Sequence, residues 1–338
     1  MQPWDAGNHP NRVTTTTLGA NGPAVSRFSL GCMGMSGMYG PSDRAESIAT
    51  VHAAVAAGVT LLDTGDFYGM GHNEMLLGEA LQGRRQEVLL SVKFGGMRAP
   101  GGAFIGIDGR PEAVKNFVSY SLQRLRTDYI DVYRLARLDP NVPIEDTVGA
   151  IADLIRAGYV RHVGLSEMGA ETARRAHATH PIVDLQIEYG LISRGMEAKI
   201  LPALRELGVG VTAYGVLSRG LLSGSKVSGA GDFRAHVPRF SGDNLKKNEA
   251  IVAELAAMAE EKRVSVSQLA IAWVLSKGTD IVPVLGARTR VQLAEALGAL
   301  DVSLTAEDVA KLEEICAPSR VAGTRYDAAQ MSMLDSER

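Results

Sequence analysis

Eight short runs rich in β-branched and apolar residues alternate with longer stretches of helical periodicity along this chain. Nearly every run is followed by a helix candidate, which favours parallel strands joined by right-handed crossovers. Eight such units in 338 residues predict a (β/α)8 TIM barrel, since a doubly wound sheet of this length usually has fewer strands. The predicted strands are Phe28–Gly31, Val59–Asp63, Val88–Lys93, Tyr129–Tyr133, Val160–Leu165, Val183–Ile187, Val209–Tyr214 and Ile281–Leu285.

Helical periodicity is clearest in the stretches 42–58, 110–128, 143–158, 169–180, 248–262, 265–278 and 289–300. Ser42 is the expected N-cap of the first, and Pro111 and Pro143 stand where a first helical turn tolerates proline. Ahead of the first strand, "VTTTTLGANGPAVSRFSL" contains Asn-Gly and Gly-Pro punctuation. We therefore predict an N-terminal β-hairpin that caps the bottom of the barrel.

The sequence predicts a single domain over residues 1–338, because no linker divides it. Its core spans about 13–316, and 1–12 and 318–338 are expected as peripheral tails. The Gly- and Ser-rich stretch 219–245 is too long for a plain strand-to-helix connection, and loops of that length are usually functional or disordered.

Composition excludes several classes of function. The net charge is −3 with no basic block, which disfavours a nucleic-acid or anionic membrane partner. No apolar stretch is long enough for a membrane span, and Cys32 and Cys316 lie in neither a metal nor a redox spacing. No His and Asp/Glu cluster at the strand ends suggests a metal, so a metal-dependent hydrolase is disfavoured. We expect a cytoplasmic protein; its oligomeric state is left open.

Polar side chains stand where two predicted strands end. Asp63 ends the second strand, Tyr68 follows in the next loop, and Lys93 ends the third strand. Active sites of TIM barrels lie at this end of the strands. A nearby ammonium lowers the pKa of a phenol, and a carboxylate can hold that ammonium in place. The three residues therefore make a proton donor for an oxyanion formed by hydride addition. The structural alternative is that Asp63 only caps a loop and that Lys93 pairs with it.

A series of motifs follows the predicted strands: "DTGDFYGMGHNEMLLGEAL", "SVKFG", "YIDVYRLARLDP", "VGLSE", "LQIEYGLISR", "AYGVLSRGLLSG", "DFRAHVPRF" and "GARTRVQLAEAL". In order and spacing, these motifs resemble those of the aldo-keto reductases. The resemblance covers about residues 13–316 and is nearest to the branch of the pyridoxal reductases and potassium-channel β subunits. It implies the same barrel, a nicotinamide cofactor across its mouth, and reversible reduction of an aldehyde or ketone. Tyr68 would be the general acid, assisted by Lys93 and Asp63.

The resemblance also implies a cofactor site. Ser166 and Gln186 would hold the nicotinamide carboxamide, and Tyr214 would stack on its ring. The pyrophosphate would be wrapped by a glycine-containing segment, with the 219–245 loop as a clasp; its residues are Gly215, Leu217, Ser218, Arg219, Gly220 and Leu222. No G-x-G-x-x-G follows the first strand, so a Rossmann mode of binding is not supported.

The adenosine end of the cofactor would meet residues 286–295. Gly286, Gln292 and Glu295 match family positions, and Arg288 would grip a 2′-phosphate, so we expect NADPH rather than NADH. A solvated helix charge is the alternative for Arg288. The asparagine usual after that glutamate is Ala296 here, which weakens the adenine contact.

One family position departs from the pattern. Ala136 stands where the fourth catalytic residue is usually a histidine that hydrogen-bonds the substrate carbonyl. Water or another polar group could take over that contact, the substitution could be engineered, or the protein could be an NADPH-binding redox sensor or accessory subunit with little turnover. Arg137 matches a family arginine expected to be structural and paired with Asp139. The substrate pocket would include Ala136, Met35 and Phe67.

Overall fold

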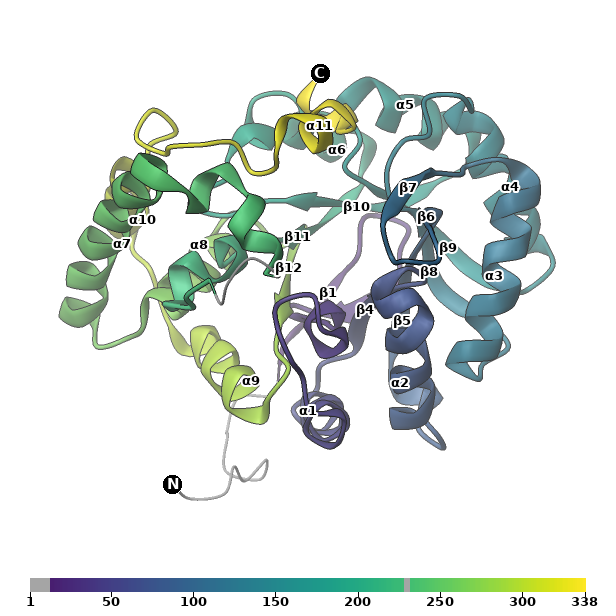
Figure 1. Cartoon of the computed structure of the whole chain (residues 1–338), viewed down its shortest axis with the longest axis horizontal. Helices are drawn as coiled ribbons and strands as arrows, with labels where there is room; N and C mark the ends of the chain where they lie inside the picture. The colour runs from purple at the N-terminus through teal and green to yellow at the C-terminus, as the bar shows by residue number, and fades with distance from the viewer. Residues whose placement is uncertain (1–12, 228–231) are drawn as a thin grey trace.

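The computed structural model describes residues 13–227 and 232–338, and its centre is a closed barrel of eight parallel strands (Figure 1). The predicted (β/α)8 barrel is thereby confirmed. Each predicted strand is present within a few residues of its expected bounds. In chain order, which is also the order around the barrel, the strands are β3 (Ser29–Gly31), β4 (Leu61–Gly65), β5 (Leu89–Phe94), β8 (Ile130–Leu135), β9 (Val160–Ser166), β10 (Ile182–Glu188), β11 (Gly210–Tyr214) and β12 (Ile281–Gly286).

Helices surround the barrel, and all seven predicted stretches contain one. The helices are α1 (Arg44–Ala56), α2 (His72–Ala80), α3 (Pro111–Leu125), α4 (Ile144–Arg156), α5 (Ala170–Thr179), α6 (Ile200–Leu207), α7 (Gly242–Lys262), α8 (Val266–Ser276), α9 (Arg290–Leu297), α10 (Ala306–Ile315) and α11 (Ala328–Ser332). The periodicity of the sequence did not predict the short helices α2, α6, α10 and α11. The N-cap of α1 is Asp43, whose carboxylate accepts from the backbone N–H of Glu46, whereas Ser42 donates to the Met35 carbonyl.

The predicted N-terminal hairpin is present and closes the bottom of the barrel. Strands β1 (Thr15–Thr17) and β2 (Ala24–Ser26) pair antiparallel. Leu18 and Val25 from this hairpin pack against side chains inside the barrel, in a buried apolar cluster with Leu61, Val132, Val183 and Val282. Water is thereby excluded from the end of the barrel opposite the strand C-termini.

A second hairpin follows β5 and was not predicted. Its strands, β6 (Gly96–Arg98) and β7 (Phe104–Ile107), pair antiparallel beside the barrel mouth. Phe104 and Ile105 are exposed there. The strands are only three and four residues long and lie in a Gly- and Pro-containing stretch, so they carry too little periodicity for detection.

Residues 318–338 were expected to form a peripheral tail. Instead, this C-terminal segment is attached to the barrel mouth. In Figure 1 this yellow segment runs from α10 across the top of the view to α11. Arg325 and Leu334 within it are buried. The expected tail 1–12, and residues 228–231 of the expected long loop, lie outside the described residues.

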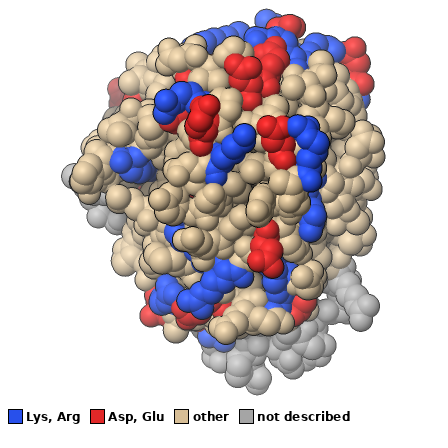
Figure 2. Space-filling model, turned by 90° about the vertical axis from the view of Figure 1, so that its right-hand side faces the viewer, with Lys and Arg blue, Asp and Glu red and all other residues tan. Residues whose placement is uncertain are grey.

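The outer surface carries both signs of charge. On the face in Figure 2, basic and acidic side chains are interspersed, consistent with the small net charge. Within the described residues, no helix is long and apolar enough to cross a membrane.

Candidate active site

Asp63, Lys93 and Tyr68 meet at the mouth of the barrel. Asp63 lies on β4 and Lys93 near the end of the adjacent β5, and the Lys93 Nζ donates to Asp63 Oδ1 at 2.5 Å. Tyr68 begins the 3-10 turn after β4, which brings its ring beneath the ammonium: Lys93 Nζ lies 5.2 Å from the ring centroid. All three side chains are buried. The sequence therefore located a true cluster, and parallel pairing of β4 and β5 explains why it forms.

Burial dominates the electrostatics of this cluster. It raises the pKa of the Tyr68 phenol well above its ordinary value, and the Asp63 carboxylate adds to this effect. Burial likewise lowers the pKa of Lys93, against the opposing effect of Asp63. We expected Lys93 to lower the pKa of Tyr68; the net direction is the opposite, because the phenol is desolvated and the ammonium is bonded to the carboxylate. The phenol therefore keeps its proton until a stronger base develops beside it.

A polar layer below the cluster holds Asp63 in place. The Ser91 hydroxyl donates to Asp63 Oδ2 at 3.0 Å and accepts from Arg134 at 2.9 Å. Arg134 in turn donates to Asp184 at 2.8 Å, and both of these side chains are 0% exposed. Removing either member would leave an uncompensated buried charge. Ser91 and the Arg134–Asp184 ion pair therefore hold the Asp63 carboxylate on the side away from the barrel mouth.

A cavity of about 490 Å³ opens above the cluster. It is lined by most of the predicted site residues, namely Asp63, Phe67, Tyr68, Lys93, Ala136, Ser166, Gln186, Tyr214, Gly215, Leu217, Arg219, Gly220, Gly286, Arg288 and Gln292. Four predicted residues are not among its lining. Met35 packs into the hydrophobic core, and Ser218 and Leu222 are buried in the turn beneath the wall. Glu295 is exposed, one helical turn beyond Gln292 on α9.

The residues expected at the nicotinamide are in the cavity wall, and each has a protein partner; the Ser166 hydroxyl lies 3.5 Å from Arg137 Nη1. The Gln186 amide donates to Asp63 Oδ2 at 2.7 Å. The Tyr214 hydroxyl donates to Glu167 at 2.6 Å. After Tyr214, the chain turns at Gly215 with φ +70°, where a Cβ would come within 2.9 Å of the Glu188 side chain. Only glycine permits that turn without strain, and it leaves no side chain at position 215 to narrow the cavity.

The far end of the cavity presents a guanidinium suited to a phosphate. Arg288 donates to the carbonyls of Tyr39 and Pro41 at 3.0 and 3.2 Å. No carboxylate lies within 4 Å of Arg288 among residues 13–227 and 232–338. Its backbone N–H donates to Gln292 at 3.0 Å, which fixes the start of α9. A cation held by neutral groups at a cavity rim fits the 2′-phosphate of an NADP-type dinucleotide.

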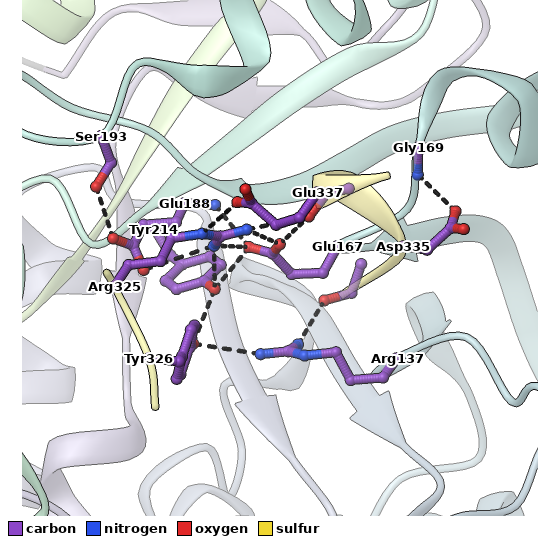
Figure 3. Close-up of polar contacts among 12 residues, drawn as sticks. Arg137, Glu167, Gly169, Glu188, Ser193, Tyr214, Arg325, Tyr326, Asp335 and Glu337 are labelled. Atoms are coloured by element: carbon purple, nitrogen blue, oxygen red, sulfur yellow. Dashed lines mark hydrogen bonds and ion pairs between the residues drawn. The ribbon is translucent and has the colours of Figure 1, made fainter. Parts of the chain in front are cut away.

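Sequence reasoning missed a buried charge cluster that fastens the C-terminal segment over the mouth (Figure 3). Arg325 donates to both oxygens of Glu167, at 2.7 and 2.6 Å, and to Glu337 at 2.8 Å. The neighbouring Tyr326 hydroxyl lies 3.0 Å from that of Tyr214. Its ring lies 4.3 Å from the guanidinium carbon of Arg219. No local pattern signals the contacts with Glu167, Tyr214 and Arg219, because these residues lie more than a hundred positions from Arg325 and Tyr326.

Arg219 and the long loop are tied to the same segment. Arg219 donates to Glu188 at 3.0 Å and to the Arg325 carbonyl at 2.6 Å. Arg239, in the short 3-10 turn Pro238–Phe240, donates to Ser193 at 2.7 Å and to the Gly323 carbonyl at 3.3 Å. The loop and the C-terminal segment therefore border the cavity as one connected wall.

Ala136 lies directly after β8 and lines the cavity, so no imidazole is present at this position. The expected pairing of Arg137 with Asp139 is wrong. The Asp139 carboxylate accepts from the backbone N–H groups of Gly109 and Asn141, at 2.9 Å each. The Arg137 side chain lines the same cavity as Ala136, because strand alternation ends at Leu135.

Comparisons with known proteins agree with this geometry. The model of the aldo/keto reductase family matches residues 27–317. This chain belongs to the aldo-keto reductase family. It is 39% identical over 321 residues to a probable aldo-keto reductase 1 of Glycine max, covering 93% of this chain and 92% of that protein.

Two solved structures of aldo-keto reductase type are also similar. A glycerol dehydrogenase from Gluconobacter oxydans superposes with a TM-score of 0.81 at 28% identity, over 91% of this chain and 97% of that one. A thermostable aldo-keto reductase in complex with the inhibitor epalrestat superposes with a TM-score of 0.71 at 25% identity, over 89% of this chain and 99% of that one. The family membership inferred from the motifs is confirmed. The narrower likeness to pyridoxal reductases and channel β subunits stays a prediction.

Proposed function

We propose that this aldo-keto reductase is an NADPH-dependent reductase of aldehydes or ketones, reversible with secondary alcohols. The observation that carries the proposal is the buried Asp63–Lys93 ion pair beside the Tyr68 phenol, at the floor of a cavity of about 490 Å³. A buried ion pair at the base of a cavity, next to a protonated phenol, provides acid–base chemistry where water is largely excluded.

In this proposal the bound cofactor supplies the hydride that adds to the carbonyl carbon. The electron pair of the C=O π bond moves to the oxygen, which takes the proton of Tyr68. Because its pKa is raised by burial, the phenol releases this proton only as the oxyanion develops. Lys93, held by Asp63, lies within reach of the phenolate charge, and a proton from water then restores the phenol.

The cofactor assignment rests on Arg288, whose guanidinium is held by two backbone carbonyls at the rim of the cavity. Ser166, Gln186 and Tyr214 are proposed at the nicotinamide end. This requires Gln186 to exchange its bond to Asp63 for one to the cofactor, and the aromatic face of Tyr214 to accept the ring. A small carbonyl compound would occupy the part of the cavity near Phe67 and Ala136. A cytoplasmic location remains a prediction.

A stopped-flow single turnover tests the proposal. The protein is preloaded with NADPH and mixed with aldehydes, diketones and bulky cyclic ketones, and loss of nicotinamide absorbance is followed. We expect oxidation in the parent, and loss of at least 10²-fold in Tyr68→Phe with unchanged NADPH affinity. Equal rates in the two proteins would refute the role of Tyr68.

Ala136 favours a second candidate, an NADPH-binding sensor or accessory subunit with little turnover. The missing imidazole is the specific observation, since loss of one donor at an oxyanion costs about 10²–10³ in rate. Tight NADPH binding without oxidation in the parent, together with activity in Ala136→His, would support this candidate over the reductase.

A further inference from the structure

We propose that the guanidinium of Arg137 faces the substrate carbonyl oxygen and stabilises the oxyanion, in the place that the missing imidazole would otherwise fill. This inference rests on the proposed reductase function and deepens it. It assigns a catalytic role to a residue that the sequence analysis treated as structural.

The first observation is the position of the guanidinium. Arg137 and Ala136 both line the cavity, together with Tyr68 and Lys93. Arg137 Nη1 donates to the Ala136 carbonyl at 2.6 Å and lies 3.5 Å from the Ser166 hydroxyl. It therefore contacts both Ala136 and Ser166, a residue proposed at the nicotinamide.

The second observation is that Arg137 has no carboxylate in direct contact in the part of the chain that the structure describes. Burial lowers its pKa, but Tyr214, Tyr326 and, at longer range, Glu167 outweigh this effect and raise it. No carboxylate oxygen lies within 4 Å of Arg137 across the described ranges 13–227 and 232–338. Asp139 bonds backbone N–H groups, and Glu167 is held by both terminal nitrogens of Arg325. Partly buried arginines usually have an anionic partner, because desolvating an unpaired charge costs several kcal/mol. A negative charge developing in the cavity would supply the anionic partner in direct contact that residues 13–227 and 232–338 do not.

The third observation is that donors remain available. Arg137 Nη2 donates to the Tyr326 hydroxyl at 3.3 Å, and the guanidinium carbon lies 5.9 Å from that ring. Arginine has five N–H donors. The contacts with Ala136, Ser166 and Tyr326 use at most three of them, so the others can bind an oxygen. The same contacts fix the guanidinium, so little reorganisation is needed when charge develops.

The electrostatics of the neighbouring groups agree with this placement. Burial raises the pKa of Tyr68, and the charge of Arg137 acts in the opposite direction. Burial lowers the pKa of Lys93, and Arg137 adds to that effect. The guanidinium therefore interacts with the same phenol that is proposed to protonate the substrate oxygen.

The test compares Arg137→Met, Arg137→Lys and Arg137→Met/Ala136→His with the parent. Each protein is saturated with NADPH, and hydride transfer to neutral benzaldehyde and 1-phenyl-1,2-propanedione, and to anionic phenylglyoxylate, is measured in single turnovers. Arg161→Met is the matched control. Arg161 is exposed at the opposite end of β9, where its guanidinium carbon lies 4.5 Å from the Tyr129 ring.

We expect Arg137→Met to slow hydride transfer to both neutral carbonyls by about 10²–10³-fold, with NADPH affinity within threefold of the parent. Arg137→Lys should keep part of the rate, since it keeps the charge. Ala136→His should restore much of it in the Arg137→Met background. Arg161→Met should match the parent.

Two results would overturn the assignment. A defect in Arg137→Met confined to the KM of phenylglyoxylate would mean that Arg137 binds a substrate carboxylate. A defect confined to NADPH affinity would place it in the cofactor site. If the parent oxidises no NADPH with any of these carbonyls, the proposed function fails. In that case the affinity of the protein–NADP⁺ complex for benzoate is compared between the parent and Arg137→Met. An unchanged affinity for benzoate would refute an anion-binding role for Arg137.

Discussion

Replacing Arg325 by methionine should detach the C-terminal segment from the barrel mouth. Arg325 donates to both oxygens of Glu167, and the side chains are 7% and 0% exposed. Breaking a buried ion pair by removing one partner costs about 3–5 kcal/mol, because the remaining charge stays desolvated. The Ser336 and Tyr214 hydroxyls and the backbone N–H of Glu188 would remain as hydrogen-bond donors to Glu167, but none of them carries a compensating charge.

The pKa of Glu167 gives an independent magnitude. Burial alone raises this pKa, but the hydrogen bonds and charge of Arg325, helped by the charge of Arg137 and the Ser336 hydroxyl, outweigh burial and lower it from 4.5 to about 2. At about 1.4 kcal/mol per pH unit, this difference corresponds to about 3 kcal/mol. The lowered pKa means that this stabilisation is complete above about pH 4.5 and is lost as the pH falls towards 2. Both routes give the same order of magnitude.

Limited proteolysis at pH 7 measures the detachment directly. We expect cleavage within 318–338 to be about 10²-fold faster in Arg325→Met than in the parent, since 1.4 kcal/mol is a factor of ten. Arg320→Met is the matched control, because Arg320 pairs with Glu254 at the surface, with 40% and 46% exposure. An exposed pair of this kind contributes below about 1 kcal/mol.

Urea unfolding completes the comparison. The double variant Arg325→Met/Glu167→Gln should be less destabilised than Arg325→Met alone, since it leaves no unpaired buried charge. If Arg325→Met and Arg320→Met show the same protease sensitivity and the same unfolding free energy, the ion pair does not hold the segment and the reasoning is refuted.

Three further predictions concern the cofactor, the ion pair and the polar layer. Arg288→Met should weaken NADPH by about 10–100-fold and leave NADH unchanged in fluorescence titrations, whereas Arg290→Met, which removes an exposed pair with Glu46, should change neither. Asp63→Asn should lower hydride transfer by about 10²-fold, with recovery as the pH is lowered, because Lys93, its pKa already lowered by burial, regains its proton; a flat pH profile would contradict this. Arg134→Met should cost about 3–5 kcal/mol in urea unfolding, and a loss below 1 kcal/mol would count against it.

The sequence by itself determined the barrel and the central part of the site. Strand and helix periodicities are local properties, and eight alternations leave few architectures that bury all the apolar faces. Asp63 and Lys93 could be located because each lies near the end of a strand, and parallel strands place those ends together. Tyr68 follows from the short turn after β4. The motifs then led to the family without any knowledge of long-range contacts.

Only the tertiary structure decided what covers the barrel mouth and how charges are shared there. Arg325 and Glu167 are 158 residues apart, and Gln186 and Asp63 are 123 apart, so no local pattern links them. Arg137 was assigned to Asp139 because the two are neighbours in sequence, yet backbone N–H groups satisfy that carboxylate and leave the guanidinium facing the cavity. Hydrophobic periodicity specifies which face of an element is buried. The partner of a buried charge depends instead on where the whole chain brings its polar groups.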